Sequence, residues 1–171
     1  TGYIPPIASK AGGMLARTIA ALRGKDYKSK LLDYLVVDSF NKAVKDAGTK
    51  ADWISTNKDN VAAYLADEKS GFSFGAGGYA TLTALTKEAC APATFRAIPH
   101  GLPLLFIAGA EDPVGSMGEG VRKVASMARE AGVKDVEVKI YDGMRHEILN
   151  EVDHMRVYDD VMAWLDQHLD G

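Results

Sequence analysis

The sequence predicts an α/β fold, because a helical first half is followed by a strand–helix–strand–helix pattern. Residues 104–108 form a short continuous apolar run and residues 136–141 alternate between apolar and polar side chains, both of which are typical of strands, and an amphipathic segment separates them. A helical connection between successive strands is typical of a right-handed crossover, which makes the strands parallel. The chain has 171 residues, enough for one sizeable core.

Residues 1–95 are predicted to be helical. Gly24 and Gly48 lie where helix ends are expected. Between residues 52 and 78, polar residues and a glycine cluster interrupt the pattern, so we expect short helices joined by loops, with no strand. The apolar residues that recur at three- and four-residue steps are Met14, Leu15, Ile19 and Leu22, then Leu31, Leu32, Leu35, Val36 and Phe40.

Residues 96–171 are predicted to form the parallel unit. The continuous apolar run at 104–108 is typical of a strand buried on both faces. A loop over residues 109–120 leads to a helix that stops near Gly132, and a closing helix follows the second strand. Two parallel strands make a small sheet, so we expect further strands elsewhere. The residues expected to face inward from the two helices are Val121, Val124, Ala128, Val157, Val161, Trp164 and Leu165.

Composition excludes several classes of protein. The formal net charge of −3 gives no basic footprint for nucleic acid or anionic membrane, and no apolar run is long enough to span a bilayer. Cys90 is the single cysteine, which excludes an internal disulfide framework and a cysteine-based zinc site. Thr1 opens the chain without a basic leader or apolar segment, so we expect a cytoplasmic protein.

Two polar residues follow the two predicted strands. Asp112 lies in the loop after the first strand, and His146 lies in the loop after the second. In open α/β sheets ligands bind at the carboxyl ends of strands, where these side chains would meet. A carboxylate that accepts from Nδ1–H of an imidazole leaves Nε2 free to take a proton from a nucleophile. Each residue alone could be structural, Asp112 as a turn former before Pro113 and His146 as a surface loop residue; together they favour catalysis.

The segments Leu-Pro-Leu-Leu-Phe-Ile-Ala-Gly-Ala-Glu-Asp-Pro-Val-Gly (102–115) and Ile-Tyr-Asp-Gly-Met-Arg-His-Glu-Ile-Leu-Asn-Glu (140–151) resemble the α/β-hydrolase superfamily. The similarity is to its lysophospholipase and monoacylglycerol-lipase-like branch, also grouped with serine aminopeptidases. The resemblance implies that Asp112 is the acid and His146 the base of a catalytic triad. It also implies a helical cap in residues 1–95 and the C-terminal portion of the hydrolase sheet in residues 96–171.

The family's nucleophile is a serine in a G-x-S-x-G turn between a strand and a helix, upstream of the acid. This chain begins downstream of that turn, so the resemblance implies a C-terminal part whose serine and oxyanion hole lie in a missing N-terminal part. Residues 71–75, Gly-Phe-Ser-Phe-Gly, match the motif literally, but a polar segment precedes them where a buried strand is needed. We therefore expect Ser73 to be a cap residue facing the substrate pocket.

Other motifs fail on spacing. His146-Glu147 opens a zinc-type H-E-x-x-H motif, but Asn150 stands where the second histidine is required. The glycines at residues 115–120 do not have dinucleotide-binding spacing. No metal or organic cofactor is therefore expected. Arg145 and Glu147 could orient the histidine loop or the cap, or form surface ion pairs, and Glu151 could form a salt bridge within the loop; none is assigned a catalytic role.

The expected function of the parent protein is hydrolysis of a small-molecule carboxylic ester such as a monoacylglycerol or lysophospholipid. The 171-residue chain alone is expected to be inactive without its N-terminal half. Two alternatives stay open, a non-catalytic module that binds an acyl ligand or a partner, and a peptidase of the same fold. The exposed sheet edge beside residues 104–108 also predicts self-association.

Overall fold

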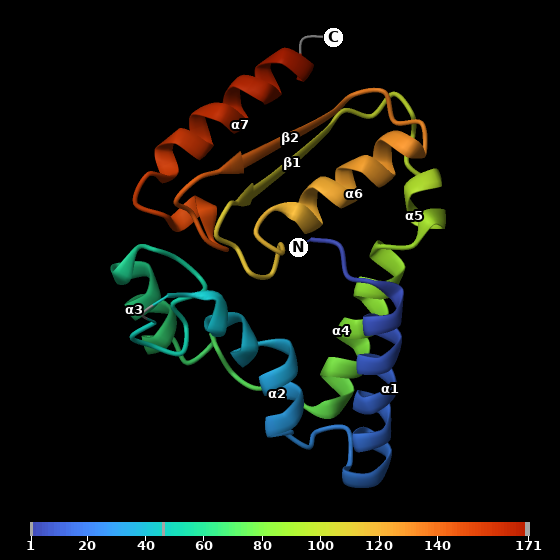
Figure 1. Ribbon diagram of the computed structural model, residues 1–171, viewed down its shortest axis with the longest axis vertical. Helices are drawn as coiled ribbons and strands as arrows, with labels where there is room; N and C mark the ends of the chain where they lie inside the picture. Colours follow the sequence, from blue (N-terminus) through green and yellow to red (C-terminus); the bar gives the residue numbers. More distant parts are fainter. Residues whose placement is uncertain (1, 46, 170–171) are drawn as a thin grey trace.

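The computed structural model describes residues 2–45 and 47–169. Its first half is helical, and its second half holds two strands with helices on both sides (Figure 1). The elements in chain order are α1 (Pro6–Arg23), α2 (Lys30–Val36), the 3-10 helix η1 (Asp38–Ala43), α3 (Lys58–Ala66), α4 (Ala76–Ala89), α5 (Pro92–Arg96), β1 (Leu104–Gly109), α6 (Glu119–Glu130), β2 (Val136–Tyr141), the 3-10 helix η2 (Ile148–Asn150) and α7 (His154–Leu169).

The strands β1 and β2 pair in parallel, as predicted. The register runs from Leu104 opposite Val136 to Gly109 opposite Tyr141, so both strands end at the same level. Side chains of β1 alternate between two cores: Phe106 packs with α6, and Ile107 packs with α7. The helices α6 and α7 therefore cover opposite faces of the sheet.

The expectation that β1 is buried on both faces is only partly met. Residues 104–107 are half-buried, and only Ala108 and Gly109 at the carboxyl end are buried. The physical reason is the size of the sheet, because two strands in the described chain leave the outer edge of β1 without a neighbour. The apolar sequence of β1 is thus better suited to a wider sheet than the one that residues 2–45 and 47–169 form.

The helices α1 and α4 pack side by side along their length (Figure 1). Gly13 permits this approach, since a Cβ at that position would lie 3.0 Å from Oγ1 of Thr83. The core between the helices also receives Leu32 from α2, and the hydroxyl of Tyr79 in α4 donates to Asp33 of α2 at 2.5 Å. These contacts join α1, α2 and α4 into one packed group.

Of the two helix ends predicted at glycines, one is confirmed and one is wrong. α1 ends at Arg23, and Gly24 follows with a φ of 95°, which favours glycine. Gly48 does not end a helix, because the preceding helix is η1, which ends at Ala43. The amide of Gly48 instead donates to the buried carboxylate of Asp52 at 2.7 Å.

The division expected between residues 95 and 96 falls inside α5. Phe95 is buried among residues of α6 and the strands, including Ala128 and Val136. α5 therefore packs with the α/β half of the chain, and the helical half that precedes it ends with α4.

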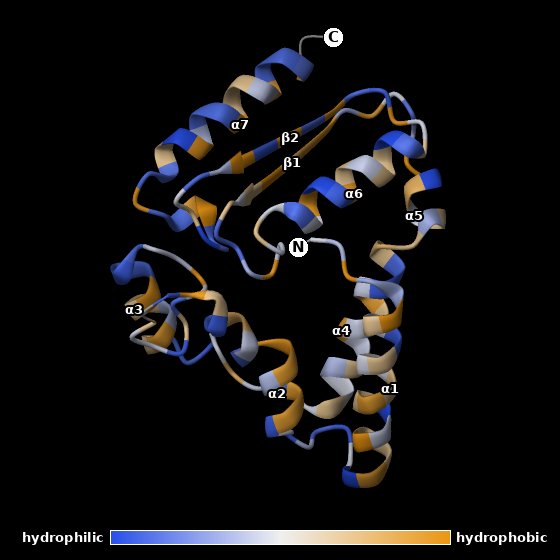
Figure 2. Cartoon of the chain, viewed as in Figure 1, coloured by the Kyte–Doolittle hydropathy of each residue, from blue (hydrophilic) through white to orange (hydrophobic). Residues whose placement is uncertain are grey.

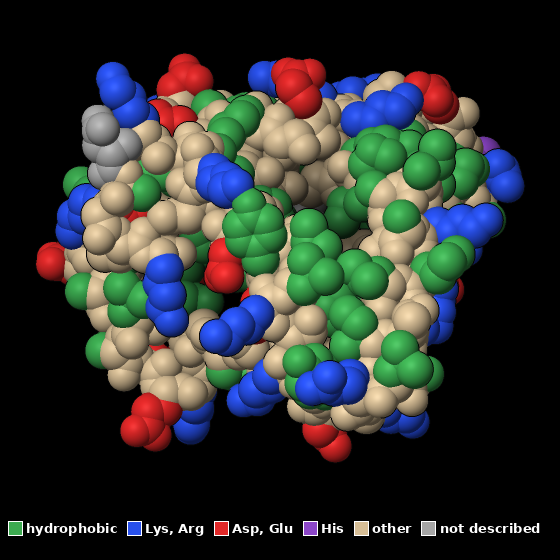
Figure 3. Space-filling view, turned by 60° about the horizontal axis from the view of Figure 1, so that its bottom comes forward, with side chains coloured by type: hydrophobic (Ala, Val, Ile, Leu, Met, Phe, Trp, Pro, Cys, Tyr) green, Lys and Arg blue, Asp and Glu red, His purple; other side chains and the backbone are tan. Residues whose placement is uncertain are grey.

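Many large apolar side chains of the first half are exposed. Figure 2 shows hydrophobic residues interspersed along α1 and α2, and Figure 3 shows hydrophobic side chains gathered around a hollow on the face carrying these helices. Ile7 is 84% and Leu22 is 77% exposed in α1. Apolar surface of this extent marks a contact or binding surface. Among the described residues, no helix combines the length and apolarity needed to cross a bilayer.

We predict that the 171-residue chain self-associates through the open edge of β1, because unpaired strand edges recruit further strands. Light scattering over a concentration series should show a mass that rises above that of one chain. A constant monomer mass at high concentration would contradict this prediction.

Candidate active site

The structure brings Asp112 and His146 together. Nδ1 of His146 lies 3.2 Å from each carboxylate oxygen of Asp112. Asp112 is 4% exposed, whereas the side chain of His146 is 30% exposed. When Nδ1 carries the proton it donates to the carboxylate, and Nε2 is left as a free acceptor. No hydrogen-bond partner of Nε2 is found within the described part of the chain.

The loop after β1 holds Asp112 in an ionised state. Burial raises the pKa of the Asp112 carboxyl, but hydrogen bonds from His146 and from the amides of Val114 and Gly115 outweigh it, and the pKa is lowered. The amide of Val114 donates at 2.8 Å, and the amide of Met117 donates to the backbone carbonyl of Asp112 at 2.8 Å. Asp112 is thus available as a negatively charged partner for the imidazole.

The loops after β1 and β2 touch because β1 ends in glycine. A Cβ on Gly109 would lie 2.2 Å from the carbonyl oxygens of Met144 and Arg145. The loops are also joined by the backbone: the amide of Ala110 donates to Tyr141, and the amide of Glu111 donates to Met144 at 2.9 Å. The absence of a side chain at residue 109 therefore sets the spacing between Asp112 and His146.

Glu151 fixes the histidine loop to the helical half of the chain. Its carboxylate is 1% exposed and accepts from the amide of Arg145 at 2.7 Å, next to His146. It also accepts from the amide of Thr56 at 3.0 Å and from the Thr56 hydroxyl at 2.5 Å. Burial raises the pKa of Glu151, but these donors outweigh it and the pKa is lowered. A buried carboxylate with several donors is a rigid junction.

Further contacts join residues 52–56 to the same loop. The guanidinium of Arg145 donates to the carbonyl oxygens of Asp52 and Ser55, at 2.7 and 3.3 Å. The amide of Glu147 donates to the carbonyl of Ile54 at 2.8 Å. Arg145 was expected either to orient the loop or cap or to form a surface ion pair. These hydrogen bonds support orientation of the histidine loop, and Arg145 also forms a 3.8 Å ion pair with Glu111.

Trp53 lies against the imidazole. The ring centroids of Trp53 and His146 are 5.2 Å apart with the planes inclined at 45°, and the ring of Phe40 packs against Trp53 at a centroid distance of 5.5 Å. No motif in the sequence indicated this contact. It could not have been found from spacing, because Trp53 and His146 are far apart in the chain.

A cavity of about 220 Å³ lies beside Trp53, between α2, α4 and the segment before α4. Ser73 lines this cavity. No strand precedes Ser73 in the described chain; residues 67–74 form turns and loop before α4 begins at Ala76. The structural setting of a nucleophile turn is therefore absent around Ser73.

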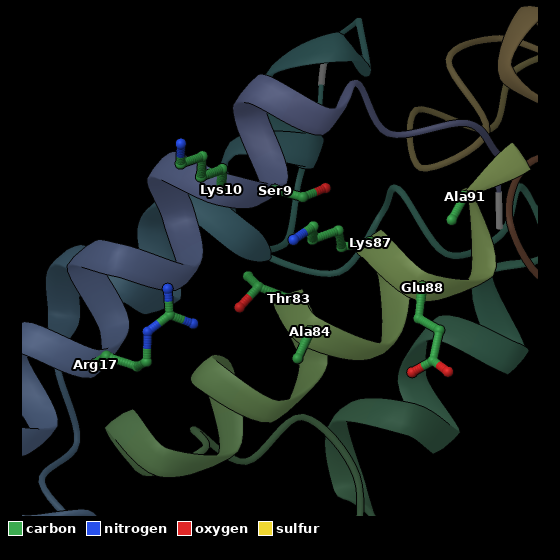
Figure 4. Close-up of a pocket in the computed structure, with 8 residues that line it drawn as sticks. All are labelled: Ser9, Lys10, Arg17, Thr83, Ala84, Lys87, Glu88 and Ala91. Atoms are coloured by element: carbon green, nitrogen blue, oxygen red, sulfur yellow. The ribbon is translucent and has the colours of Figure 1, made fainter. Parts of the chain in front are cut away.

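A larger cavity of about 400 Å³ lies between α1 and α4 (Figure 4). Lys10, Arg17, Lys87 and Glu88 surround it. Neither Asp112 nor His146 lines this cavity, so it is separate from the acid–histidine pair.

One cluster of charged residues was not predicted. Asp135, Glu137 and His168 bring potential ligand atoms within 4.8 Å of one another. Both ring nitrogens of His168 already face acceptors: Nδ1 lies 2.6 Å from the carbonyl of Trp164, and Nε2 lies 2.9 Å from Asp135. The hydrogen bond to the Trp164 carbonyl is the largest cause that raises the pKa of His168, and the hydrogen bond to Asp135 is the next. The cluster ties the end of α7 to the start of β2, at the opposite end of the strand from His146.

The parallel strands, the helices on both sheet faces and the helical first half define a portion of an α/β-hydrolase. The family model described as serine aminopeptidase S33 (Hydrolase_4) matches residues 3–153, and the chain belongs to this family.

Individual relatives agree with this assignment. A segment of 77 residues is 38% identical to part of a monoacylglycerol lipase from Mycolicibacterium smegmatis. The aligned segment covers 43% of this chain and 25% of that relative. A highly thermostable carboxyl esterase from Bacillus coagulans superposes with a TM-score of 0.86 at 22% identity, over 98% of this chain and 54% of that one. A lipase in its open form gives a TM-score of 0.84 at 25% identity, over 97% and 54%. The chain thus spans about half the length of these two structures.

We predict that Gly109→Ala destabilises the fold by about 2 kcal/mol or more, because the new Cβ clashes with two backbone carbonyls. The free energy of unfolding is measured by urea denaturation. Gly101→Ala is the matched control, since a Cβ there meets no atom within 4 Å, and its effect should stay within about 1 kcal/mol. Equal effects of the two substitutions would contradict the proposed close approach.

We predict that Glu151→Gln costs about 2 kcal/mol of stability at pH 7, because an amide cannot accept from all the donors that face this carboxylate. The pKa of Glu151 is lowered in the folded state, so its charge stabilises the fold above about pH 4.5, and the contribution is lost as pH falls through the folded-state pKa. The difference between wild type and variant should therefore shrink below pH 4.5. The exposed Glu68→Gln should show neither effect.

Proposed function

We propose that this chain is the C-terminal part of a serine hydrolase that cleaves carboxylic esters, with Asp112 as the acid and His146 as the base of its triad. The single observation that carries the proposal is the 3.2 Å approach of Nδ1 of His146 to both oxygens of Asp112, at the ends of adjacent strands. The nucleophilic serine and the oxyanion hole would come from residues outside these 171. The helical first half, residues 1–95, would act as a cap.

The chemistry follows from this geometry. Asp112 accepts from Nδ1–H and orients the ring, so Nε2 takes the proton of the serine hydroxyl as its oxygen attacks the ester carbonyl. Asp112 also stabilises the imidazolium that forms. The imidazolium then returns the proton to the leaving alcohol, and a water molecule repeats the sequence on the acyl-enzyme. Backbone amides from outside the chain would stabilise the tetrahedral oxyanion.

Monoacylglycerols and lysophospholipids are the leading substrates. A monoacylglycerol lipase and a carboxyl esterase are among the similar proteins, which favours an ester. The family description, serine aminopeptidase, favours a second candidate, cleavage of a peptide bond after an N-terminal residue. The same triad can attack either carbonyl. A non-catalytic binding module is the remaining alternative, and the preserved Asp112–His146 contact argues against it.

The test is hydrolysis of 1-monooleoylglycerol and p-nitrophenyl butyrate by the protein expressed from its complete reading frame. His146→Ala and Asp112→Asn should each lower kcat/KM by about 10³-fold or more, because the imidazole is removed or loses its oriented tautomer. Alanine p-nitroanilide in parallel tests the peptidase alternative. The 171-residue chain alone should give no turnover.

Ser73→Ala should still turn over ester, since Ser73 lacks the setting of a nucleophile. Loss of all activity in this variant would make Ser73 the nucleophile. Full activity of His146→Ala would eliminate the proposed triad.

A further inference from the structure

The cavity beside Trp53 has an unusual lining. Five aromatic side chains contribute to it, and both of its charged residues are carboxylates, Asp33 and Asp38. No lysine or arginine lines it, although the chain has 20 of them. The aromatic residues are Trp53, Tyr64, Phe72, Phe74 and Tyr79.

Two of these rings are held in place while exposed to solvent. Phe72 is 59% and Phe74 is 42% exposed, and their rings pack edge-on at 5.5 Å. Phe74 in turn packs edge-on against buried Tyr79 at 5.6 Å. The aromatic wall is therefore preformed and accessible, as a ligand surface requires.

The two carboxylates retain their capacity for a cation. Oδ1 of Asp33 accepts a hydrogen bond from the Tyr79 hydroxyl at 2.5 Å, so Oδ2 remains available to a ligand. Within the described residues, neither Asp33 nor Asp38 has an ion-pair partner. Negative charge beside several aromatic side chains favours an organic cation, because the carboxylates attract positive charge and so does the face of an aromatic ring that the cation can reach.

The cavity is next to the proposed base. Trp53 is shared: it lines the cavity and lies 5.2 Å from the imidazole of His146, centroid to centroid. The ring of Trp53 therefore separates a group held in the cavity from the proposed base. The volume of about 220 Å³ suits a compact head group.

We propose that the cavity beside Trp53 binds an alkylammonium group, and that the preferred substrates are esters carrying such a group close to the scissile carbonyl. The second part of this inference rests on the proposed ester hydrolysis. The first part, binding of the cation, does not depend on it.

Binding is tested on the complete protein by NMR titration with choline chloride and with its uncharged carbon analogue, 3,3-dimethylbutan-1-ol. Choline should bind about tenfold more tightly than the analogue, through cation–π and charge attraction. The double variant Asp33→Asn, Asp38→Asn should reduce this preference to near one. Asparagine at residue 33 keeps an oxygen for the Tyr79 hydroxyl, so the fold should be retained, which thermal unfolding checks. Asp166→Asn, on the exposed surface of α7, is the matched control and should keep the preference.

Activity is tested with a matched pair of esters, butyrylcholine and 3,3-dimethylbutyl butanoate. The ratio of kcat/KM should favour the choline ester about tenfold in the wild type and fall toward one in the double variant. Equal binding of choline and its analogue by the wild type would overturn the inference, and so would a preference that survives the double variant. Selective choline binding without hydrolysis of either ester would uphold the cation site and reject the proposed hydrolase function. Hydrolysis of both esters at equal rates without selective binding of choline would uphold the proposed hydrolase function and reject the cation site.

Discussion

The in-register pairing of β1 and β2 places Gly109 opposite Tyr141, so the loops carrying Asp112 and His146 leave the sheet at one level. The contact between Asp112 and His146 depends on this alignment. A shift of one residue would turn each side chain of a strand to the other face. It would also separate Gly109 from the carbonyls of Met144 and Arg145, against which it packs. The parallel strand pair therefore sets the relative positions of Asp112 and His146.

A second constraint acts on the histidine loop from the opposite side. The carboxylate of Glu151 is buried, so it must be satisfied by hydrogen bonds, and its donors come from Arg145 and from Thr56. This links the loop after β2 to residues that precede it by about ninety positions in the chain. The imidazole of His146 is thus held by Asp112 on one side and bordered by Trp53 on the other.

The local pattern of the sequence predicts most of the second half of the fold. The strand at residues 136–141 and the helix stop at Gly132 are found where the pattern puts them, because alternation and a left-handed glycine are local properties. The pairing of Asp112 with His146 was also predictable, since both follow strand ends. The roles of Trp53 and Thr56 were not, because their contacts join distant segments. The prediction at Gly48 failed for a different reason: its amide donates to the buried carboxylate of Asp52, four residues further on, in a local turn that helix-end statistics do not distinguish from a helix end.

The junction around Glu151 has a consequence for motion. Residues 52–57 and the histidine loop are joined by several hydrogen bonds. The packed group of α1, α2 and α4 has a core of its own, and residues 37–51, 67–75 and 90–91 connect it to the rest of the chain. Any displacement of α2 and α4 relative to residues 52–57 would have to be absorbed by these connections, because the junction keeps residues 52–57 against the histidine loop. The cavity beside Trp53 is lined from both groups, so such a displacement would change its width.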